Sequence, residues 1–302
     1  MPLFWGGTPA CVSDPFTSLK EYRVHSLLPL VGPGVVVFLV ATLARFVTFK
    51  LILGPIASAA CPGVAAEKTR RKFREAAWRS CLYAVACGWA CNVLLLGDDL
   101  PWMRESELFW KGWPDQIVTR AMVSIYELYL GLYVHQLVFL FLDTRTSDFP
   151  ALVFHHVVTL SIVVASWSVG FTRVGAFTMV LHDVSDVFLE LAKCFNYAKT
   201  AHPKLSIGAD VSFVVFAITF FALRLGVYPV RVVYSAAFEA CGHVSCIEPP
   251  TLANCMPTVT YMVFLPLLLA LQILQLFWGW KIIGVITTVL RGKELEDPRD
   301  DE

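Results

Sequence analysis

Residues 27–53 read LLPLVGPGVVVFLVATLARFVTFKLIL, an apolar run in which the charged positions are Arg45 and Lys50. A helix needs about 20 mainly apolar residues to cross the hydrocarbon core of a bilayer, so this run predicts a transmembrane helix. Comparable runs follow, separated by short polar breaks, and we expect about seven such helices. They are predicted at residues 27–53, 78–96, 121–142, 151–169, 174–195, 207–230 and 257–290. The sequence therefore predicts an all-α, polytopic membrane protein.

Composition supports this fold class. Hydrophobic residues make up 57% of the 302 positions and charged residues only 16%, and the mean hydropathy of +0.63 lies above that of ordinary soluble chains. The 24 basic and 24 acidic residues give a formal net charge of +0. Without a long-range positive field, nucleic acid is not an expected partner.

The basic residues predict an orientation in the membrane. Short loops rich in Lys and Arg stay in the cytosol, and such residues gather at 68–74, at 199–204 and after 290. Seven crossings then place the N-terminus in the lumen and the C-terminus in the cytosol. The loop between the last two helices becomes lumenal, an oxidising setting in which Cys241, Cys246 and Cys255 can form one disulfide. Which two would pair is left open.

Polar residues inside the apolar helices indicate where function lies. The two segments are FHHVVT at 154–159 and LHDVSDVFLE at 181–190. A charged side chain at the centre of a membrane helix costs roughly 2.5–3.5 kcal/mol on the insertion scale, so several together need a reason. At about 100° per residue, the polar residues of each segment share one face of their helix. These faces comprise His155, His156 and Thr159 on one helix, and His182, Asp183, Asp186, Glu190 and Lys193 on the next.

The two polar faces are expected to meet, because a connection of only a few residues around 170–173 makes the two helices antiparallel neighbours. A carboxylate on one imidazole nitrogen fixes the tautomer and leaves the other nitrogen free to act as nucleophile or general base. Acyl transfer is one reaction of this kind. Metal binding is the weaker alternative, since no ligand-rich histidine repeat is present. For Lys193 we expect a structural ion pair with Glu190 or Asp186, and for the isolated His135 a structural role.

Several of these segments together resemble the Lag1 motif of ceramide synthases. The matching residues are DTRTSDF at 143–149, HHVVT at 155–159, LHDVSDVFLE at 181–190, then Lys193 and Asn196-Tyr197. The resemblance extends upstream to KFREAAW at 72–78 and WPDQ at 113–116. It implies a TLC domain over 72–290, after an N-terminal segment (1–71) with the first helix and a basic loop, and before an acidic tail (291–302). No homeodomain-like insert fits between 59 and 78, as in plant, algal or protist members.

This resemblance implies a fold and an activity. The expected fold is a six-helix barrel preceded by one further helix. The expected protein is an N-acyltransferase of the endoplasmic reticulum membrane that joins a fatty acyl-CoA to the amino group of sphinganine or phytosphingosine, releasing CoA. No cofactor or metal is expected, and homodimer formation is left open. The lumenal residues 239–255 match no family pattern, so neither the acyl length nor the preferred base follows.

The resemblance also assigns residues. It implies that His155, His156, Asp183 and Asp186 are catalytic, with an acyl-imidazole intermediate on one of the two histidines. Which histidine is the nucleophile stays open. The expected supporting residues are His182, Glu190, Thr159, Lys193 and Asn196. The expected substrate-binding residues are Arg145 and Asp148.

Two other classes of function remain. A noncatalytic TLC-domain protein that binds lipid or associates with the translocon would not need the intact set of two histidines and two aspartates. A transporter that uses the polar face as a proton relay would be expected to carry inverted repeats, and none is visible in the sequence. A purified protein that binds lipid without activity would support the first alternative.

Overall fold

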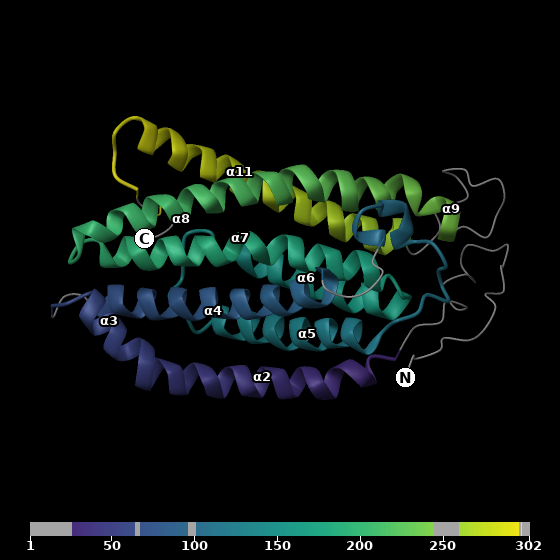
Figure 1. Ribbon diagram of the computed structural model, residues 1–302, viewed down its shortest axis with the longest axis horizontal. Coiled ribbons are helices and arrows are strands. Elements are labelled where there is room, and N and C mark those ends of the chain that lie inside the picture. Colours follow the sequence, from purple (N-terminus) through teal and green to yellow (C-terminus); the bar gives the residue numbers. More distant parts are fainter. Residues whose placement is uncertain (1–25, 64–66, 96–100, 245–259, 296, 298–302) are drawn as a thin grey trace.

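The computed structural model describes residues 26–63, 67–95, 101–244, 260–295 and 297. Within these ranges all regular structure is helical. The long helices lie side by side along the long axis of the molecule (Figure 1). They are α2 (Leu28–Thr48), which continues into α3 (Gly54–Ala60), α4 (Glu67–Leu95), α5 (Arg120–Leu140), α6 (Phe149–Val169), α7 (Thr172–Ala198), α8 (Ser206–Thr219), which continues through the π-helical stretch Phe220–Val233, and α11 (Leu265–Leu290).

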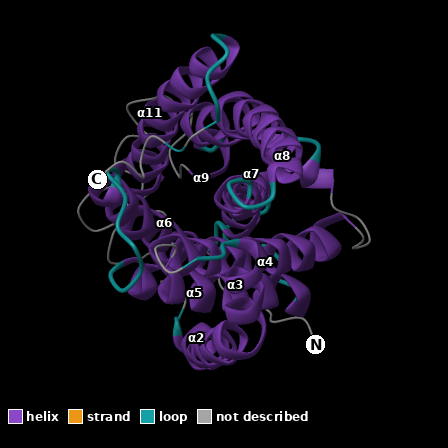
Figure 2. Cartoon of the chain, turned by 90° about the vertical axis from the view of Figure 1, so that its left-hand side faces the viewer, coloured by secondary structure: helices purple, strands orange, loops and turns teal. Residues whose placement is uncertain are grey.

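Six of these helical segments form a closed barrel. Helix α4 packs on α5, α5 on α6, α6 on α11, and α11 on the stretch Phe220–Val233. Helix α7 closes the barrel between α4 and α8 and also contacts α5 and α6, so it lies near the middle of the end view (Figure 2). Helix α2 packs on α5 from outside. This arrangement agrees with the expected six-helix barrel preceded by one helix.

The expected polytopic membrane fold is confirmed by the length and composition of the helices. Five helical segments in the described ranges are long and apolar enough to cross a bilayer, at Leu28–Ala60, Arg120–Leu140, Phe149–Val169, Pro203–Glu239 and Thr260–Leu290. Helices α4 and α7 are of similar length but carry more polar and charged residues. The number of crossings therefore stays a prediction.

Helix α4 begins at Glu67, earlier than the predicted start at residue 78. The added turns hold the basic segment, whose side chains pair along the helix. Arg70 lies 2.9 Å from Glu67, and Arg71 lies 2.9 Å from Glu75, at the spacings of three and four residues that place side chains on one face. Apolar periodicity alone missed these turns because charges, not apolar residues, support them.

The connection between α6 and α7 is as short as predicted. Gly170 ends α6 with φ 82°, a left-handed conformation that favours glycine. The Phe171 amide N–H then donates to the Ser166 carbonyl at 2.7 Å, and α7 begins at Thr172. The two helices are in contact, as expected of antiparallel neighbours.

The two ends of the barrel differ in chemistry. The basic end contains the start of α4 and the ends of α7 and α11, so the three basic segments of the sequence lie together (Figure 1). The opposite, aromatic end is filled by fully buried rings such as Trp110, Phe171 and Phe264. Cys241 at this end is disulfide-bonded, while Cys246 and Cys255 lie outside the described residues.

A close approach of three helices at the aromatic end gives a stability prediction. A Cβ atom at Gly175 on α7 would overlap the Tyr126 hydroxyl of α5 and the Ser166 side chain of α6. Gly175→Val should therefore destabilise the protein by about 1–3 kcal/mol through overpacking. Gly88→Ala is the matched control, because nothing lies within 4 Å of a Cβ there and alanine is the better helix former. Thermal unfolding in one detergent measures both, and equal stability of Gly175→Val and wild type would contradict this packing.

Candidate functional site

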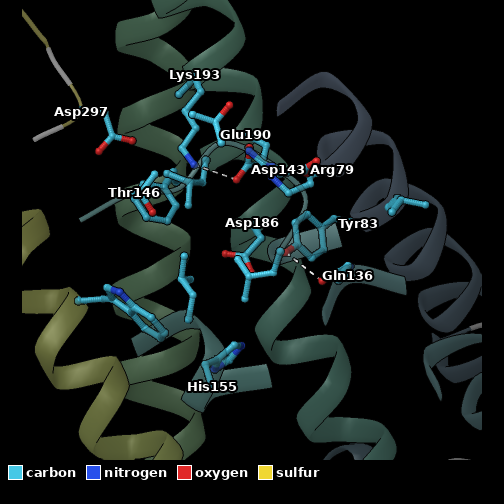
Figure 3. Close-up of a pocket in the computed structure, with 18 of the residues that line it drawn as sticks. Arg79, Tyr83, Gln136, Asp143, Thr146, His155, Asp186, Glu190, Lys193 and Asp297 are labelled. Atoms are coloured by element: carbon cyan, nitrogen blue, oxygen red, sulfur yellow. Dashed lines mark hydrogen bonds and ion pairs between the residues drawn. The ribbon is translucent and has the colours of Figure 1, made fainter. Parts of the chain in front are cut away.

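A cavity occupies the half of the barrel toward the basic end. Its lining comes from all six barrel helices and extends from Thr144–Thr146 and the C-terminal segment inward to His155 and Arg224. We call the outer part, next to Arg145, Lys281 and Asp297, the mouth. Figure 3 shows His155 at the inner end and Lys193 toward the outer end, with Asp186 between them. The expected site residues that line the cavity are Arg145, His155, His156, Asp186, Glu190, Lys193 and Asn196.

His155 has a free imidazole nitrogen. Its Nδ1 atom is buried and has no hydrogen-bond partner among the described residues. The ring centroid lies 5.5 Å from that of His156, 6.3 Å from that of His182, and 5.3 Å from that of Trp278. The two polar faces of α6 and α7 therefore meet as predicted. A buried, unpartnered ring nitrogen beside a cavity is chemically able to form a bond or take a proton.

His182 is held at both nitrogens and does not line the cavity. Its Nδ1–H donates to the Thr178 carbonyl at 2.7 Å, which leaves Nε2 as the acceptor for the Gln275 side-chain amide. This tautomer is assigned from the hydrogen-bond partners. Tyr228 packs edge-on against the ring at 5.1 Å between centroids. His182 thus fastens α7 to α11 and has no nitrogen left for chemistry.

The two aspartates have partners other than the paired histidines. The Asp183 carboxylate is buried and accepts from the Tyr133 hydroxyl of α5 at 3.0 Å. Asp186 faces the cavity and forms an ion pair with Arg224 at 2.7 Å. Among the described residues no hydrogen bond links either aspartate to His155 or His156. The sequence predicts that these carboxylates fix the histidine tautomer directly. In the structure, neither carboxylate contacts His155 or His156 in this way.

Arg224 is the partner of Asp186 that the sequence analysis did not include. It lies on the π-helical stretch Phe220–Val233, is buried, and also donates to the His182 carbonyl. Its guanidinium neutralises Asp186 and links α7 to the next helix. The sequence does contain a signal for it, since an arginine inside a predicted membrane helix is rare without a function or a partner. Gln275, an uncharged polar residue inside the apolar helix α11, is a weaker indication of the same kind.

A chain of ion pairs lines the outer part of the cavity. Glu190 lies 2.9 Å from Lys193 and 3.1 Å from Arg79 of α4. Arg79 also lies 3.4 Å from Asp143, which pairs with Arg45 of α2. The predicted structural ion pair between Lys193 and Glu190 is confirmed. Because each of these charges faces an opposite one, none is left unpaired in the apolar barrel.

The upstream motif at 72–78 contacts the segment 143–149 at the mouth. The Glu75 carboxylate accepts from the Thr144 backbone amide at 3.1 Å and from the Thr144 hydroxyl at 3.3 Å. Arg71 donates to the Leu142 carbonyl at 2.8 Å. The segment 72–78 therefore holds the loop that leads into α6.

Asp148 was expected to bind substrate, but the structure places it outside the cavity lining. Its buried carboxylate accepts from the Thr146 hydroxyl at 2.7 Å and from the Trp278 indole N–H at 3.1 Å. Trp278 in turn packs against His155. Asp148 thus joins the mouth loop to α11 and fixes the ring that lies beside the free histidine.

The remaining candidates fall into separate classes. Thr159 is buried outside the cavity lining, and its hydroxyl has no partner in the described ranges. The Asn196 side-chain oxygen is likewise unpartnered, but Asn196 lines the cavity. His135 is held by Trp78 and Thr42, each at 3.2 Å, which agrees with the structural role expected of it. No three His, Cys, Asp or Glu side chains converge as metal ligands within the described residues.

Comparison with known proteins places the chain in a family. The TLC domain matches residues 72–284. ASC1-like protein 3 of Oryza sativa subsp. japonica is 30% identical, over 85% of this chain and 90% of its own length. Ceramide synthase LOH2 of Arabidopsis thaliana is 30% identical over 87% of each chain, and ceramide synthase LOH1 of the same plant is 33% identical over 76% of this chain and 73% of its own. The chain belongs to the TLC-domain family, in its ceramide synthase group.

Proposed function

We propose that this protein is a ceramide synthase, an N-acyltransferase that joins the acyl group of a fatty acyl-CoA to the amino group of a sphingoid base. The products are a ceramide and free CoA, with sphinganine or phytosphingosine as the base. The named relatives and the TLC-domain match support this activity. The protein is placed in the endoplasmic reticulum membrane as a multi-pass protein, with its basic end toward the cytosol.

The observation that carries the proposal is the buried, unpartnered Nδ1 of His155, a residue at the inner end of a cavity lined by both ion-paired and aromatic side chains. Of the three clustered histidines, His182 has both nitrogens occupied. This leaves the pair His155 and His156, both of which line the cavity, and we assign the nucleophile to His155, which packs against Trp278 at the inner end. The apolar lining, which includes Phe213, Phe216 and Phe220, suits an acyl chain whose thioester reaches His155.

The reaction proceeds in two balanced steps. The free nitrogen of His155 attacks the thioester carbonyl, a carbon–nitrogen bond forms, and the carbon–sulfur bond breaks to release CoA as thiolate. The neutral amine of the sphingoid base then attacks the acyl-imidazole, the amide bond forms, and the imidazole leaves. The proton lost by the amine passes through His156 and is finally taken up by the CoA thiolate. Two easier steps thus replace one difficult transfer.

The aspartates take different parts in this mechanism. Asp186 faces the same space as His155 (Figure 3) and supplies negative charge where an imidazolium develops. Arg224 keeps that carboxylate in place. Asp183, hydrogen-bonded to Tyr133, positions α7 against α5 and acts at a distance from the reacting atoms.

Two cations at the mouth are suited to the phosphates of CoA. The Arg145 guanidinium stacks on Phe149 at 4.7 Å, and the Lys281 ammonium lies 4.9 Å from the Phe277 ring centroid. Neither pairs with a carboxylate among the described residues. Charged groups of this kind bind phosphate oxygens through strong, charge-assisted hydrogen bonds. Arg145 keeps the substrate-binding role expected of it, and Lys281 is added.

The nucleophile assignment is tested with purified protein, a fatty acyl-CoA and sphinganine. Mixed with acyl-CoA alone, the wild type should gain the mass of one acyl group. His155→Ala should lose this adduct and lower ceramide formation by about 1,000-fold or more, as expected for removal of a nucleophile. His156→Ala should keep the adduct but slow its transfer by about 100-fold, as expected for a lost proton shuttle.

The matched control is His202→Ala at the exposed turn after α7, which should leave activity unchanged. An adduct that persists in His155→Ala but disappears in His156→Ala would exchange the two roles. A folded wild type that binds lipid without forming ceramide would favour the noncatalytic alternative.

A single and a double variant of the Arg224–Asp186 ion pair separate the structural role of Arg224 from its chemical role. Arg224→Met leaves Asp186 as an unpaired buried charge and should cost about 3–5 kcal/mol of stability. The double variant Arg224→Met with Asp186→Leu should regain most of this stability, because no lone charge remains. Activity should stay low in both variants. Thermal unfolding and ceramide formation measured together provide the test, and recovered activity in the double variant would remove Asp186 from the mechanism.

A further inference from the structure

Two polar side chains of the cavity wall are not used by the two-step mechanism. Tyr83 of α4 and Gln136 of α5 both line the cavity. The Tyr83 hydroxyl donates to the Gln136 side-chain oxygen at 3.3 Å. A hydrogen bond of this kind fastens neighbouring helices together in a membrane. Because this one faces the cavity, the same two side chains are also placed to contact a ligand.

The hydrogen bond from Tyr83 leaves Gln136 with a free donor. The bond assigns Oε1 as the acceptor, so the amide nitrogen Nε2 is the group that remains. No described residue accepts a hydrogen bond from this nitrogen. Gln136 keeps 8% of its surface exposed and lines the cavity. A side-chain amide carries two N–H donors, and Gln136 therefore offers them to a ligand in the cavity.

Asp186 supplies an acceptor in the same part of the cavity. Its Oδ2 atom forms the ion pair with Arg224, and the side chain is 17% exposed. No described residue donates a hydrogen bond to the other oxygen, Oδ1. The carboxylate acts electrostatically on the Tyr83 hydroxyl, and α4, α5 and α7 all pack on one another. Figure 3 shows Asp186 with Tyr83 and Gln136 on the outer side of His155.

We propose that Asp186, Gln136 and Tyr83 form the subsite for the polar head of the sphingoid base. The identity of this substrate rests on the proposed function. Such a base carries its amine between two hydroxyl-bearing carbons. Asp186 accepts a hydrogen bond from the amine, and Gln136 donates one to a hydroxyl group. Two-point binding of this kind fixes the direction in which the amine faces.

The residues of the subsite have different roles. Gln136 contacts the substrate and determines specificity, because a base without the recognised hydroxyl leaves its donor unpaired. Tyr83 is a positioning residue that holds the Gln136 amide in the required orientation. The subsite binds and orients the base, and the proton transfers of the two steps stay as they are.

The test compares three bases with full-length protein and one fatty acyl-CoA. Sphinganine is measured beside 1-deoxysphinganine and 3-deoxysphinganine, each of which lacks one hydroxyl. Gln136→Leu removes the free donor, and Tyr83→Phe removes the hydroxyl that orients it. Gln272→Leu on α11 is the matched control, a half-buried glutamine outside the cavity lining. Both kcat/KM and equilibrium binding of the bases without acyl-CoA are measured.

The wild type should prefer sphinganine over one of the deoxy bases by about 3- to 10-fold, the effect of one hydrogen bond. Gln136→Leu should abolish this preference, and Tyr83→Phe should reduce it by about 2-fold. Gln272→Leu should keep it. The acyl adduct formed with acyl-CoA alone should be unchanged in all three variants, because no base is present in that step.

A wild type that accepts all three bases equally would overturn the subsite, and so would a preference that persists in Gln136→Leu. If Gln136→Leu does not fold, Tyr83→Phe decides, because it lacks only one oxygen atom. A protein that forms no ceramide, yet shows in binding a preference that Gln136→Leu removes, would overturn the proposed activity and leave the subsite in place.

Discussion

The structure depends on the pairing of charges inside an apolar barrel. Helix α7 carries Asp186, Glu190 and Lys193 through a bundle whose outer surface is apolar, and each of these charges has an opposite partner. The partners Arg79 and Arg224 come from the two helices that flank α7. Because an unpaired charge in this setting costs several kcal/mol, the ion pairs fix the position of α7 relative to its neighbours.

The same requirement separates the histidines that have hydrogen-bond partners from those that do not. His182 is satisfied at both ring nitrogens, and His135 is satisfied by Trp78 and Thr42. His155 has a buried nitrogen without a partner, beside Trp278 and the cavity. A buried polar group without a partner is destabilising, and such groups concentrate at functional sites. The Thr159 hydroxyl and the Asn196 side-chain oxygen lack partners in the same region. This contrast with His182 and His135 is the physical basis for placing the chemistry on the pair His155 and His156.

The cavity has two different boundaries. Its inner end meets the layer of Arg224 and His155, beyond which the barrel is packed with aromatic side chains. Its outer end is surrounded by Arg145, Lys281 and the C-terminal segment. A substrate with a charged head and an apolar chain fits such a gradient, since the charged part stays at the wet, basic end.

Apolar runs and helical periodicity are local properties, so they predicted the all-helical membrane fold and the ranges of most helices to within a few residues. They also predicted that the polar faces of α6 and α7 meet. The sequence also predicted the ion pair of Lys193 with Glu190, which lie one turn apart. The partners of the two aspartates, Tyr133 for Asp183 and Arg224 for Asp186, are visible only in the folded chain. These partners lie 50 and 38 positions apart along the chain, and only the packing of whole helices brings them together.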